Sequence, residues 1–215
     1  MRLIFLGLIM VTASVSGVDF YDDFEDDYIG DWEERCNPAD WYAQDGMAHC
    51  ESWSSPYPSP YALIAPGSIF TEDCTLQTRG SAVHVLGLVA RLDESDSGVM
   101  GYVSPDHNVA RIRLVSNGNL GEILESMTAD FPSNVQYNLT LVCQGENLQF
   151  LIEAPVLDME WQLFATDPNP GTGQFGLLTG DEPHACWEWF QASQYLAAET
   201  GIWACDVDDD AQGGS

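Results

Sequence analysis

The sequence predicts an all-β protein, folded as an antiparallel sandwich or barrel. The first observation is a series of short apolar segments between Val83 and Gly180, recurring about every 8–12 residues and separated by polar turns. The second is the dipeptide Asp45-Gly46, a strong signal for a tight hairpin turn. The third is that helical periodicity is nearly absent, and only residues 190–199 could form a short helix. Together these patterns favour one domain of strands joined by turns.

The expected strands can be placed in order along the chain. A hairpin over residues 41–50 comes first, and prolines exclude the following loop, 54–60, from any central strand. The segment Ser116-Asn-Gly-Asn119 is a turn between two later strands. The remaining strands are expected at 61–64, 74–78, 85–91, 98–103, 109–115, 120–124, 137–142, 148–152 and 173–178.

The first residues, 1–17, have the pattern of a secretory signal peptide. Arg2 precedes an apolar run that is too short to span a bilayer, and Val15-Ser-Gly17 supplies the small residues of a cleavage site. We therefore expect a secreted protein, extracellular or periplasmic, with one domain at 18–200 and no membrane insertion. Residues 201–215 are acidic and rich in glycine, and we expect a tail there.

The charge balance excludes several classes of partner. The chain has 34 acidic residues against 6 basic ones, a formal net charge of −28, and all the basic residues are arginine. Nucleic acid and anionic membrane surfaces are poor partners for such a field, whereas divalent cations are better ones. Surplus acid without lysine also suits a salty habitat, where counterions screen the self-repulsion.

Six cysteines agree with export, because an even number in a secreted chain is typical of disulfides. Their spacing does not match a zinc site. Proximity in the sequence favours three pairs as a hypothesis: Cys36 with Cys50, Cys186 with Cys205, and Cys74 with Cys143, the last joining two strands.

Five motifs together resemble the concanavalin A-like, laminin G-like jelly rolls, including the bacterial 3-keto-disaccharide hydrolase-type and family-16-like domains. Phe24-Glu-Asp-Asp-Tyr-Ile-Gly-Asp-Trp32 is similar to their opening, and Gly87-Leu-Val-Ala-Arg91 to a "G-L-V-x-R" strand. Gly101-Tyr-Val103, Tyr137-Asn-Leu-Thr-Leu-Val-Cys-Gln-Gly145 and Gly173-Gln-Phe-Gly-Leu-Leu178 match later strands. The resemblance implies a two-sheet antiparallel jelly-roll sandwich.

This fold hosts lectins, adhesion modules, glycosidases and structural domains, so the motifs do not identify a ligand. The resemblance covers roughly residues 19–197. The closing strand of the family is poorly matched by Phe190-Gln-Ala-Ser-Gln-Tyr195, which lacks the aspartate expected there. Any cation site that depends on that aspartate is therefore less well supported.

Calcium is one chemical hypothesis, because many jelly rolls of this type bind it near their N-terminal strand. The metal candidates are Asp23, Glu25 and Asp26 within an acidic segment. On an extended strand Asp23 and Glu25 would share one face, opposite Asp22 and Asp26. The alternative is a solvated acidic stretch in an acidic protein.

Catalysis by a carboxylate pair is a second hypothesis. Asp158 and Glu160 are two residues apart in a strand-like run and could share a face, as a glycosidase pair requires. The pair is similar to part of the active-site strand of family-16 glycoside hydrolases, but the flanking acids of that motif are missing. The alternative is an exposed strand face.

Aromatic residues carry the hint of sugar binding, because sugar rings stack on aromatic faces. The candidates are Trp53 and Tyr57 in the proline-rich loop, with Trp41 and Tyr42 nearby; the alternative is that they pack the loop. We expect the remaining large aromatics in the core: Trp32, Trp161 and one of Trp187 and Trp189.

These observations favour a secreted, non-catalytic glycan-binding or adhesion module, with calcium as a possible structural ion. Its partner would be a polysaccharide or a cell-surface glycan. Two alternatives remain open: a glycoside hydrolase of the 3-keto-disaccharide type, and a structural or interaction domain without a small ligand.

Overall fold

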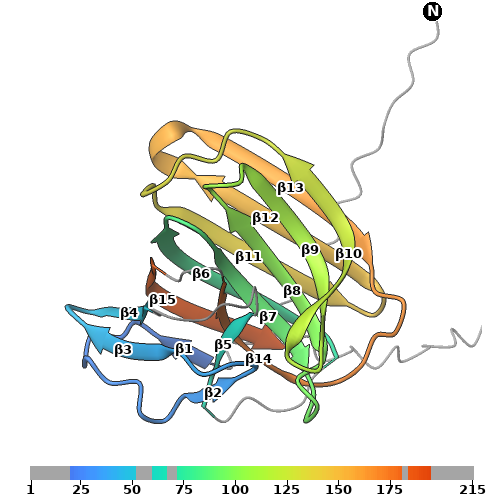
Figure 1. The fold of residues 1–215 in the computed structure, drawn as a ribbon, viewed down its shortest axis with the longest axis horizontal. Coiled ribbons are helices and arrows are strands. Elements are labelled where there is room, and N and C mark those ends of the chain that lie inside the picture. The colour runs from blue at the N-terminus through green and yellow to red at the C-terminus, as the bar shows by residue number, and fades with distance from the viewer. Residues whose placement is uncertain (1–19, 52–59, 67–71, 181–183, 195–215) are drawn as a thin grey trace, which may run out of the picture.

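Two antiparallel sheets stack face to face in the computed structural model, which describes residues 20–51, 60–66, 72–180 and 184–194 (Figure 1). The proposed signal peptide and the C-terminal tail lie outside these residues. So do Trp53, Tyr57 and Cys205. Within the described part of the chain, no helix is long and apolar enough to cross a membrane.

Sheet A has eight strands, and the long strand β15 lies among them as a central element. In spatial order the sheet contains β13 (Met159–Thr166), β12 (Asn147–Ala154), β11 (Tyr137–Gln144), β6 (Cys74–Ala82), β15 (His184–Gln194), β4 (Met47–Glu51) and β3 (Asp40–Gln44), with β1 (Phe20–Asp22) pairing β15. Residues 190–194 therefore belong to a strand, and the short helix considered for that region is absent from them. The three neighbours of β15 supply the backbone partners that fix this extended form.

Sheet B has seven strands and forms the other layer. Its spatial order is β10 (Asn119–Thr128), β9 (Val109–Ser116), β8 (Gly98–Ser104), β7 (Leu86–Leu92), β14 (Gln174–Thr179), β5 (Tyr61–Ile64) and β2 (Glu33–Arg35). A short 3-10 turn, η1 (Pro155–Leu157), connects β12 to β13 in sheet A. The strands expected from the apolar segments are confirmed, with differences of a few residues at their ends.

The main core lies between the sheets and is built by alternate residues of each strand. Leu88 of β7 and Val99 of β8 face it from sheet B, and Leu139 of β11 and Phe150 of β12 face it from sheet A; all four side chains are fully buried. This is the pattern that period-two strands produce when one face packs against a second sheet.

A smaller apolar cluster lies on the opposite, outer face of sheet B. Val89, Met100 and Leu178 belong to it, and Leu120 packs against it. The sequences of the central sheet B strands, such as β7 and β8, are therefore almost continuously apolar, because one face of each of these strands packs in the main core and the other in this smaller cluster.

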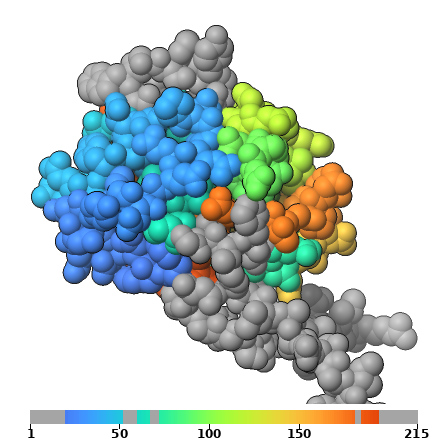
Figure 2. Space-filling view, turned by 90° about the horizontal axis from the view of Figure 1, so that it is seen from below, coloured from blue at the N-terminus to red at the C-terminus, as the bar shows by residue number. Residues whose placement is uncertain are grey.

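Hydrogen bonds hold the covering segments over that outer face. The Gly118 N–H in the β9–β10 turn donates to the Asp96 carbonyl at 2.8 Å. The Asn37 side chain donates to the carbonyls of Pro60 and Gly118, both at 3.1 Å. Four segments that are distant in the sequence thus meet beside the outer cluster. In Figure 2 the N-terminal strands (blue) lie directly beside the green part of the chain.

The N-terminal segment departs from the expected extended strand. β1 ends at Asp22, whose carboxylate accepts hydrogen bonds from the Phe24 N–H at 2.8 Å and from Trp32 Nε1 at 2.9 Å. Phe24 and Asp27 have positive φ, so the chain turns repeatedly here. Phe24 and Trp32, which lie in this turning segment, are both buried in the core.

Candidate functional site

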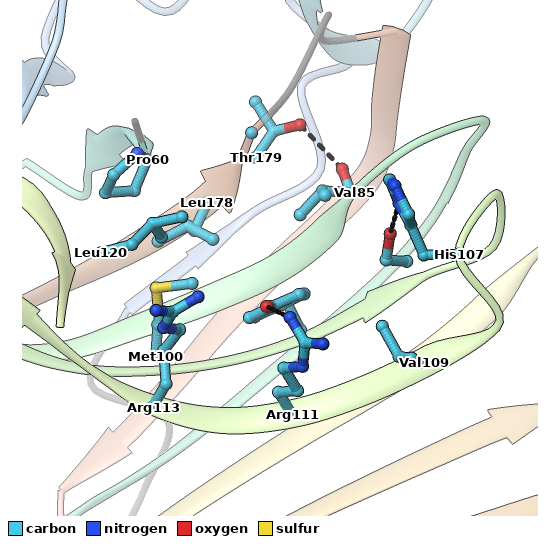
Figure 3. A pocket seen from close by; sticks show the side chains of 13 residues that line it. Pro60, Val85, Met100, His107, Val109, Arg111, Arg113, Leu120, Leu178 and Thr179 are labelled. Atoms are coloured by element: carbon cyan, nitrogen blue, oxygen red, sulfur yellow. Dashed lines mark hydrogen bonds between the residues drawn. The ribbon is translucent and has the colours of Figure 1, made fainter. Parts of the chain in front are cut away.

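The outer face of sheet B carries a pocket with an apolar floor (Figure 3). Val85, Met100 and Leu178 form much of that floor, and each is less than 10% exposed. The cavity measures about 150 Å³. Pockets for drug-sized ligands begin at about 300 Å³, so this one fits a single ring or a chain end rather than a long segment.

Polar side chains from β8 and β9 form one wall of the pocket. Tyr102 lies directly opposite Arg111 across the two strands, and Met100 lies opposite Arg113. The Arg111 Nη1 donates to the Tyr102 hydroxyl at 3.2 Å, and both Arg113 Nε and Nη2 donate to the Gly121 carbonyl, at 3.2 and 2.7 Å. In Figure 3 both arginine side chains extend from β9, with Arg113 beside Met100 and Arg111 nearer to Val109.

These two arginines lack an acidic partner within the described residues, unlike the other three arginines there. Arg35 pairs with Asp96 at 2.6 Å, Arg79 with Glu188 at 3.3 Å and Arg91 with Asp167 at 2.8 Å. The pocket side chains of the described chain also include no carboxylate. In a protein with 34 acidic residues, this wall is a local excess of positive charge.

A polar cluster closes the other end of the pocket, at Ser104 and His107. The Asp106 carboxylate accepts a hydrogen bond from the Ser104 hydroxyl at 2.8 Å and lies 2.9 Å from the Nδ1 atoms of both His84 and His107. Partial burial raises the pKa of Asp106, but the hydrogen bonds from His84 and Ser104 and the nearby His107 outweigh it. The net result is a pKa below the usual value of 3.8.

This cluster contains Ser, His and Asp, but it is not arranged as a hydrolytic triad. A triad needs the histidine to bond the serine through one nitrogen and the aspartate through the other. Here Nδ1 of His107 faces both Ser104, at 3.1 Å, and Asp106. The serine is only 3% exposed and donates to the carboxylate itself. The cluster therefore orients His107 at the pocket mouth instead of activating a nucleophile.

A second hollow, of about 470 Å³, lies at one end of the sandwich beside Arg91 and Asp167. The two buried charged side chains in its wall pair with each other, because the Arg91 guanidinium donates a hydrogen bond to the Asp167 carboxylate. Asp93, also in its wall, accepts three hydrogen bonds from Ser95 and Ser97. It is larger than the pocket on sheet B, and its buried arginine is already paired with a carboxylate.

The described aromatic candidates do not form an open platform. Trp41 packs against the core and stacks on Trp187 with ring centroids 5.3 Å apart. Tyr42 stacks on His49 at 5.0 Å and donates to Glu51 at 2.8 Å; burial and this hydrogen bond raise its pKa. Both residues are partly covered by neighbours, and the proposed roles of Trp53 and Tyr57 fall outside the described residues.

Two of the expected core tryptophans are buried, and the third is partly buried at the edge of the core. Trp32 is 7% exposed and Trp187 is fully buried, while Trp161 is partly buried and packs on Phe131 at 4.7 Å. Trp187 and Trp189 do not share a strand face, however. The register of β15 shifts between them, so Phe190 points inward after Trp187. A bulge of this kind interrupts period-two alternation.

The acidic residues proposed for calcium do not gather around one point. Asp23 accepts from the Glu25 N–H at 3.3 Å, and Asp26 accepts from the Tyr28 N–H at 3.1 Å. These are local turn contacts, and the described residues contain no group of three His, Cys, Asp or Glu that could hold a metal ion. The donor set that calcium needs is not assembled by Asp23, Glu25 and Asp26 here.

The carboxylates proposed for catalysis lie in different local structures. Asp158 has φ of 54° and follows the 3-10 turn, whereas Glu160 lies in the edge strand β13. Both are exposed, and Glu160 pairs across the strands with Glu153. The strand begins only at Met159, so the two side chains are not related by strand alternation as the sequence suggested.

The five cysteines within the described residues have free thiols in this structure. Cys74 and Cys143 lie directly opposite each other on β6 and β11. A hydrogen bond to the Cys143 sulfur, with burial, holds the pKa of Cys74 well above its usual value. Cys36 packs on the outer cluster of sheet B, whereas Cys50 lies in the core between the sheets.

Sequence reasoning did not single out Arg111, Arg113, Tyr102 or His107. The available signal was Arg111-Ile-Arg113 inside a strand segment, because alternation places both arginines on the face opposite the buried isoleucine. In a chain without lysine this local pair is unusual.

Solved structures with the same architecture are similar over most of the chain. The carbohydrate binding module CBM66 from Bacillus subtilis matches with a TM-score of 0.63 and 16% identity, covering 76% of this chain and 95% of that one. The exoplasmic/lumenal domain of VIP36 in a Ca2+-bound form matches with a TM-score of 0.57 and 12% identity. The match covers 83% of this chain and 90% of that domain. The lectin UEA-II complexed with galactose matches with a TM-score of 0.57 and 10% identity. The match covers 84% of this chain and 100% of the lectin.

The fold is a concanavalin A-like jelly roll. This jelly roll also occurs as part of larger enzymes: a xylan beta-1,4-xylosidase from Bacillus halodurans C-125 matches with a TM-score of 0.58 and 16% identity over 81% of this chain and 39% of the enzyme. Neither a family model nor a curated protein sequence matches the chain. At these identities the likeness shows the fold alone.

Proposed function

We propose that this jelly roll is a secreted, non-catalytic glycan-binding module and that the pocket on the outer face of sheet B is its binding site. The observation that carries the proposal is the pocket's construction, an apolar floor under a wall of hydrogen-bonding groups from Tyr102, Arg111 and Arg113. Sugar rings need this combination, because their C–H faces pack on apolar atoms while their oxygens seek directed partners.

The comparisons support the same function without assigning it. One similar structure is named as a carbohydrate binding module, and others are described with Man3GlcNAc or galactose bound. The hydrolase alternative has less support, because a glycosidase needs two acids about 5–9.5 Å apart at its site. The pocket side chains that the structure describes include no such pair.

Trp53 and Tyr57 remain candidates for the same site. They precede Pro60 closely in the sequence, and Pro60 lines the pocket. We propose that they extend the binding surface beyond the small cavity.

Retention on a panel of insoluble polysaccharides tests the proposal, with released sugar measured in the same samples. We expect retention without release. Val109 lines the pocket at the start of β9, so Val109→Trp should fill the cavity and reduce retention at least about tenfold. Val156→Trp is the matched control, since Val156 is 76% exposed on the connection between β12 and β13.

Released sugar that depends on the pocket would show an enzyme and overturn the non-catalytic assignment. Retention that Val109→Trp leaves unchanged would place the site elsewhere. Loss of retention in Trp53→Ala would support the extension of the site, and full retention would remove Trp53 from it.

A further inference from the structure

We propose that the pocket recognises an oxyacid anion on a sugar, either the carboxylate of a uronic acid or a sulfate ester, through Arg111 and Arg113. This inference rests on the proposed glycan-binding function and names the class of sugar. It is unexpected for a chain with a net charge of −28, whose overall field repels anions.

The first argument is the unbalanced charge of the two arginines. Placing two guanidinium groups two residues apart on one strand face costs electrostatic energy unless an anion compensates them. The protein has acids in excess, and it pairs Arg35, Arg79 and Arg91 with them. At Arg111 and Arg113, the described residues supply no carboxylate. A ligand anion would supply the missing charge.

The second argument is the set of free donors. Arg111 uses Nε on Ser126, at 3.4 Å, and Nη1 on Tyr102, while Arg113 uses Nε and Nη2 on one carbonyl. Nη2 of Arg111 and Nη1 of Arg113 have no partner in the described chain. Each of these free nitrogens can donate a charge-assisted hydrogen bond to an oxygen of a carboxylate or sulfate.

The third argument is the shortage of free acceptors. Thr179 is fully buried and Ser104 is 3% exposed, so their hydroxyl oxygens present little acceptor surface to a ligand. A neutral sugar offers hydroxyl hydrogens that need acceptors, usually Asp, Asn or Gln. The described pocket side chains include none of these three residue types. The wall therefore matches a ligand rich in acceptor oxygens.

The position of the arginines is fixed by the structure around them. Both project from the middle of β9, between β8 and β10, and the Tyr102 ring opposite Arg111 is only 5% exposed. The side chains are thus held by a rigid sheet instead of a loop, which lowers the entropy lost on binding.

Binding of the protein to three matched polysaccharides tests the inference: a polygalacturonate, a sulfated galactan and a neutral galactan. We expect retention on at least one acidic polymer and little on the neutral one, and the two acidic arms distinguish carboxylate from sulfate. Changing Arg111 and Arg113 together to Gln should reduce retention on the acidic polymer at least about tenfold, because each removes a charge-assisted hydrogen bond.

Arg79→Gln is the control for net charge, because Arg79 is about one-third exposed and lies on sheet A. It should leave retention unchanged. Changing Arg111 and Arg113 to Lys keeps both charges but removes the guanidinium hydrogen bonds to Tyr102 and Gly121 that orient the side chains. Retention should therefore exceed that of the Gln variant but stay below that of the parent. If the Gln variants do not fold, competition settles the question with the unmodified protein. The acidic monosaccharide that matches the retained polymer, galacturonate or a galactose sulfate, should then displace the protein, and free galactose should not.

The outcomes separate this inference from the proposed function. Retention on the neutral galactan that is unaffected by the arginine changes would overturn the anion inference and keep the glycan module. No retention on any polymer of the wider panel would overturn both. If Arg79→Gln lost as much retention on the acidic polymer as the Arg111 and Arg113 double variant, the effect would be one of net charge, and the proposed site would be rejected.

Discussion

Arg91 is the residue that ties the two sheets together at one end of the sandwich. Its side chain is buried and donates to the Glu72 carbonyl at 2.8 Å, the Asp167 carboxylate at 2.8 Å and the Gly145 carbonyl at 2.5 Å. These partners lie in three different connections of the chain. Arg91, the last residue of the Gly87-Leu-Val-Ala-Arg91 strand motif, is therefore a structural cation, and its satisfied donors explain why burial is tolerated.

Removing Arg91 should destabilise the protein strongly. Arg91→Met leaves the Asp167 carboxylate, which is 5% exposed, without its cation. Removing one partner of a buried pair costs about 3–5 kcal/mol. The free energy of unfolding from urea titration measures the effect. Arg79→Met is the control, because the partly exposed pair with Glu188 should contribute no more than about 1 kcal/mol. A similar loss in the free energy of unfolding for Arg91→Met and Arg79→Met would contradict this role for Arg91.

Asp106 gives a prediction about pH. Its pKa is lower in the folded protein than the usual value of 3.8. The resulting stabilisation is complete above the unfolded pKa and is lost as the pH falls through the folded pKa. We expect Asp106→Asn to be less stable than the parent at about pH 6, with the difference shrinking toward about pH 3. Urea midpoints across this range measure it.

Ser104→Ala provides the comparison for Asp106, because it removes one of the hydrogen bonds that lower the pKa of this carboxyl. It should weaken the pH dependence without abolishing it. A difference between Asp106→Asn and the parent that stays constant from pH 6 to pH 3 would show that the carboxylate charge does not stabilise the fold.

Single residues were predictable where burial follows from size. Trp32 and Trp187 are buried as expected, because a large apolar ring is placed inside wherever the strands permit. The acidic residues Asp22 and Asp26 were less predictable, since their carboxylates cap local backbone N–H groups and end the strand. Short acidic side chains compete with extended structure in this way, and the competition is not visible in strand periodicity.

At the level of elements, the strands of sheet B were predictable from apolar runs bounded by turns. The expected segments 98–103 and 109–115 correspond to β8 and β9, which end one residue later. The bulge in β15 was not predictable, because one extra residue changes which side chains face inward without altering composition. The pocket wall on β9 was not predicted for a different reason. Alternation separates the two faces of a strand, but it does not say that the outer face also lines a pocket.

The pairing of β6 with β11 leads to a prediction about Cys74 and Cys143. The two residues are direct neighbours across the strands, and their thiols are in hydrogen-bond contact. If the secreted protein meets an oxidising environment, we expect these two cysteines to be linked. Peptide mapping of the unreduced protein measures this directly. A link across so long a loop stabilises by about 4 kcal/mol, so reduction should lower the urea midpoint clearly.

Alkylation supplies the control for this cysteine pair. In the folded, reduced protein Cys74 should react slowly with iodoacetamide, because its raised pKa leaves little thiolate. Recovery of both alkylated peptides from unfolded but unreduced protein would show that no link had formed. The pairs of Cys36 with Cys50 and of Cys186 with Cys205 remain predictions that the same map tests.

The whole molecule combines an acidic exterior with one pocket wall of unpaired arginines. The net charge follows from composition and was predictable. The local exception was not, because it depends on which arginines find carboxylates after folding, and three of the five in the described chain do. The acidic surface around this pocket repels an approaching polyanion, so the direct contacts of Arg111 and Arg113 proposed above would have to outweigh that repulsion.

This charge arrangement predicts an unusual dependence of binding on salt. Between about 0.01 M and 0.15 M salt the Debye length falls from about 30 Å to about 8 Å, which removes long-range repulsion between an acidic polymer and the protein surface. Direct contacts in the pocket are screened much less. We therefore expect the affinity for an acidic polysaccharide to increase over this range, as measured by retention or calorimetry. The affinity for free galacturonate should change less with salt than the affinity for the polymer, since the monosaccharide carries a single charge. A steady decrease with salt, as counterion release produces in basic proteins that bind polyanions, would mean that the acidic surface does not govern the approach of the ligand.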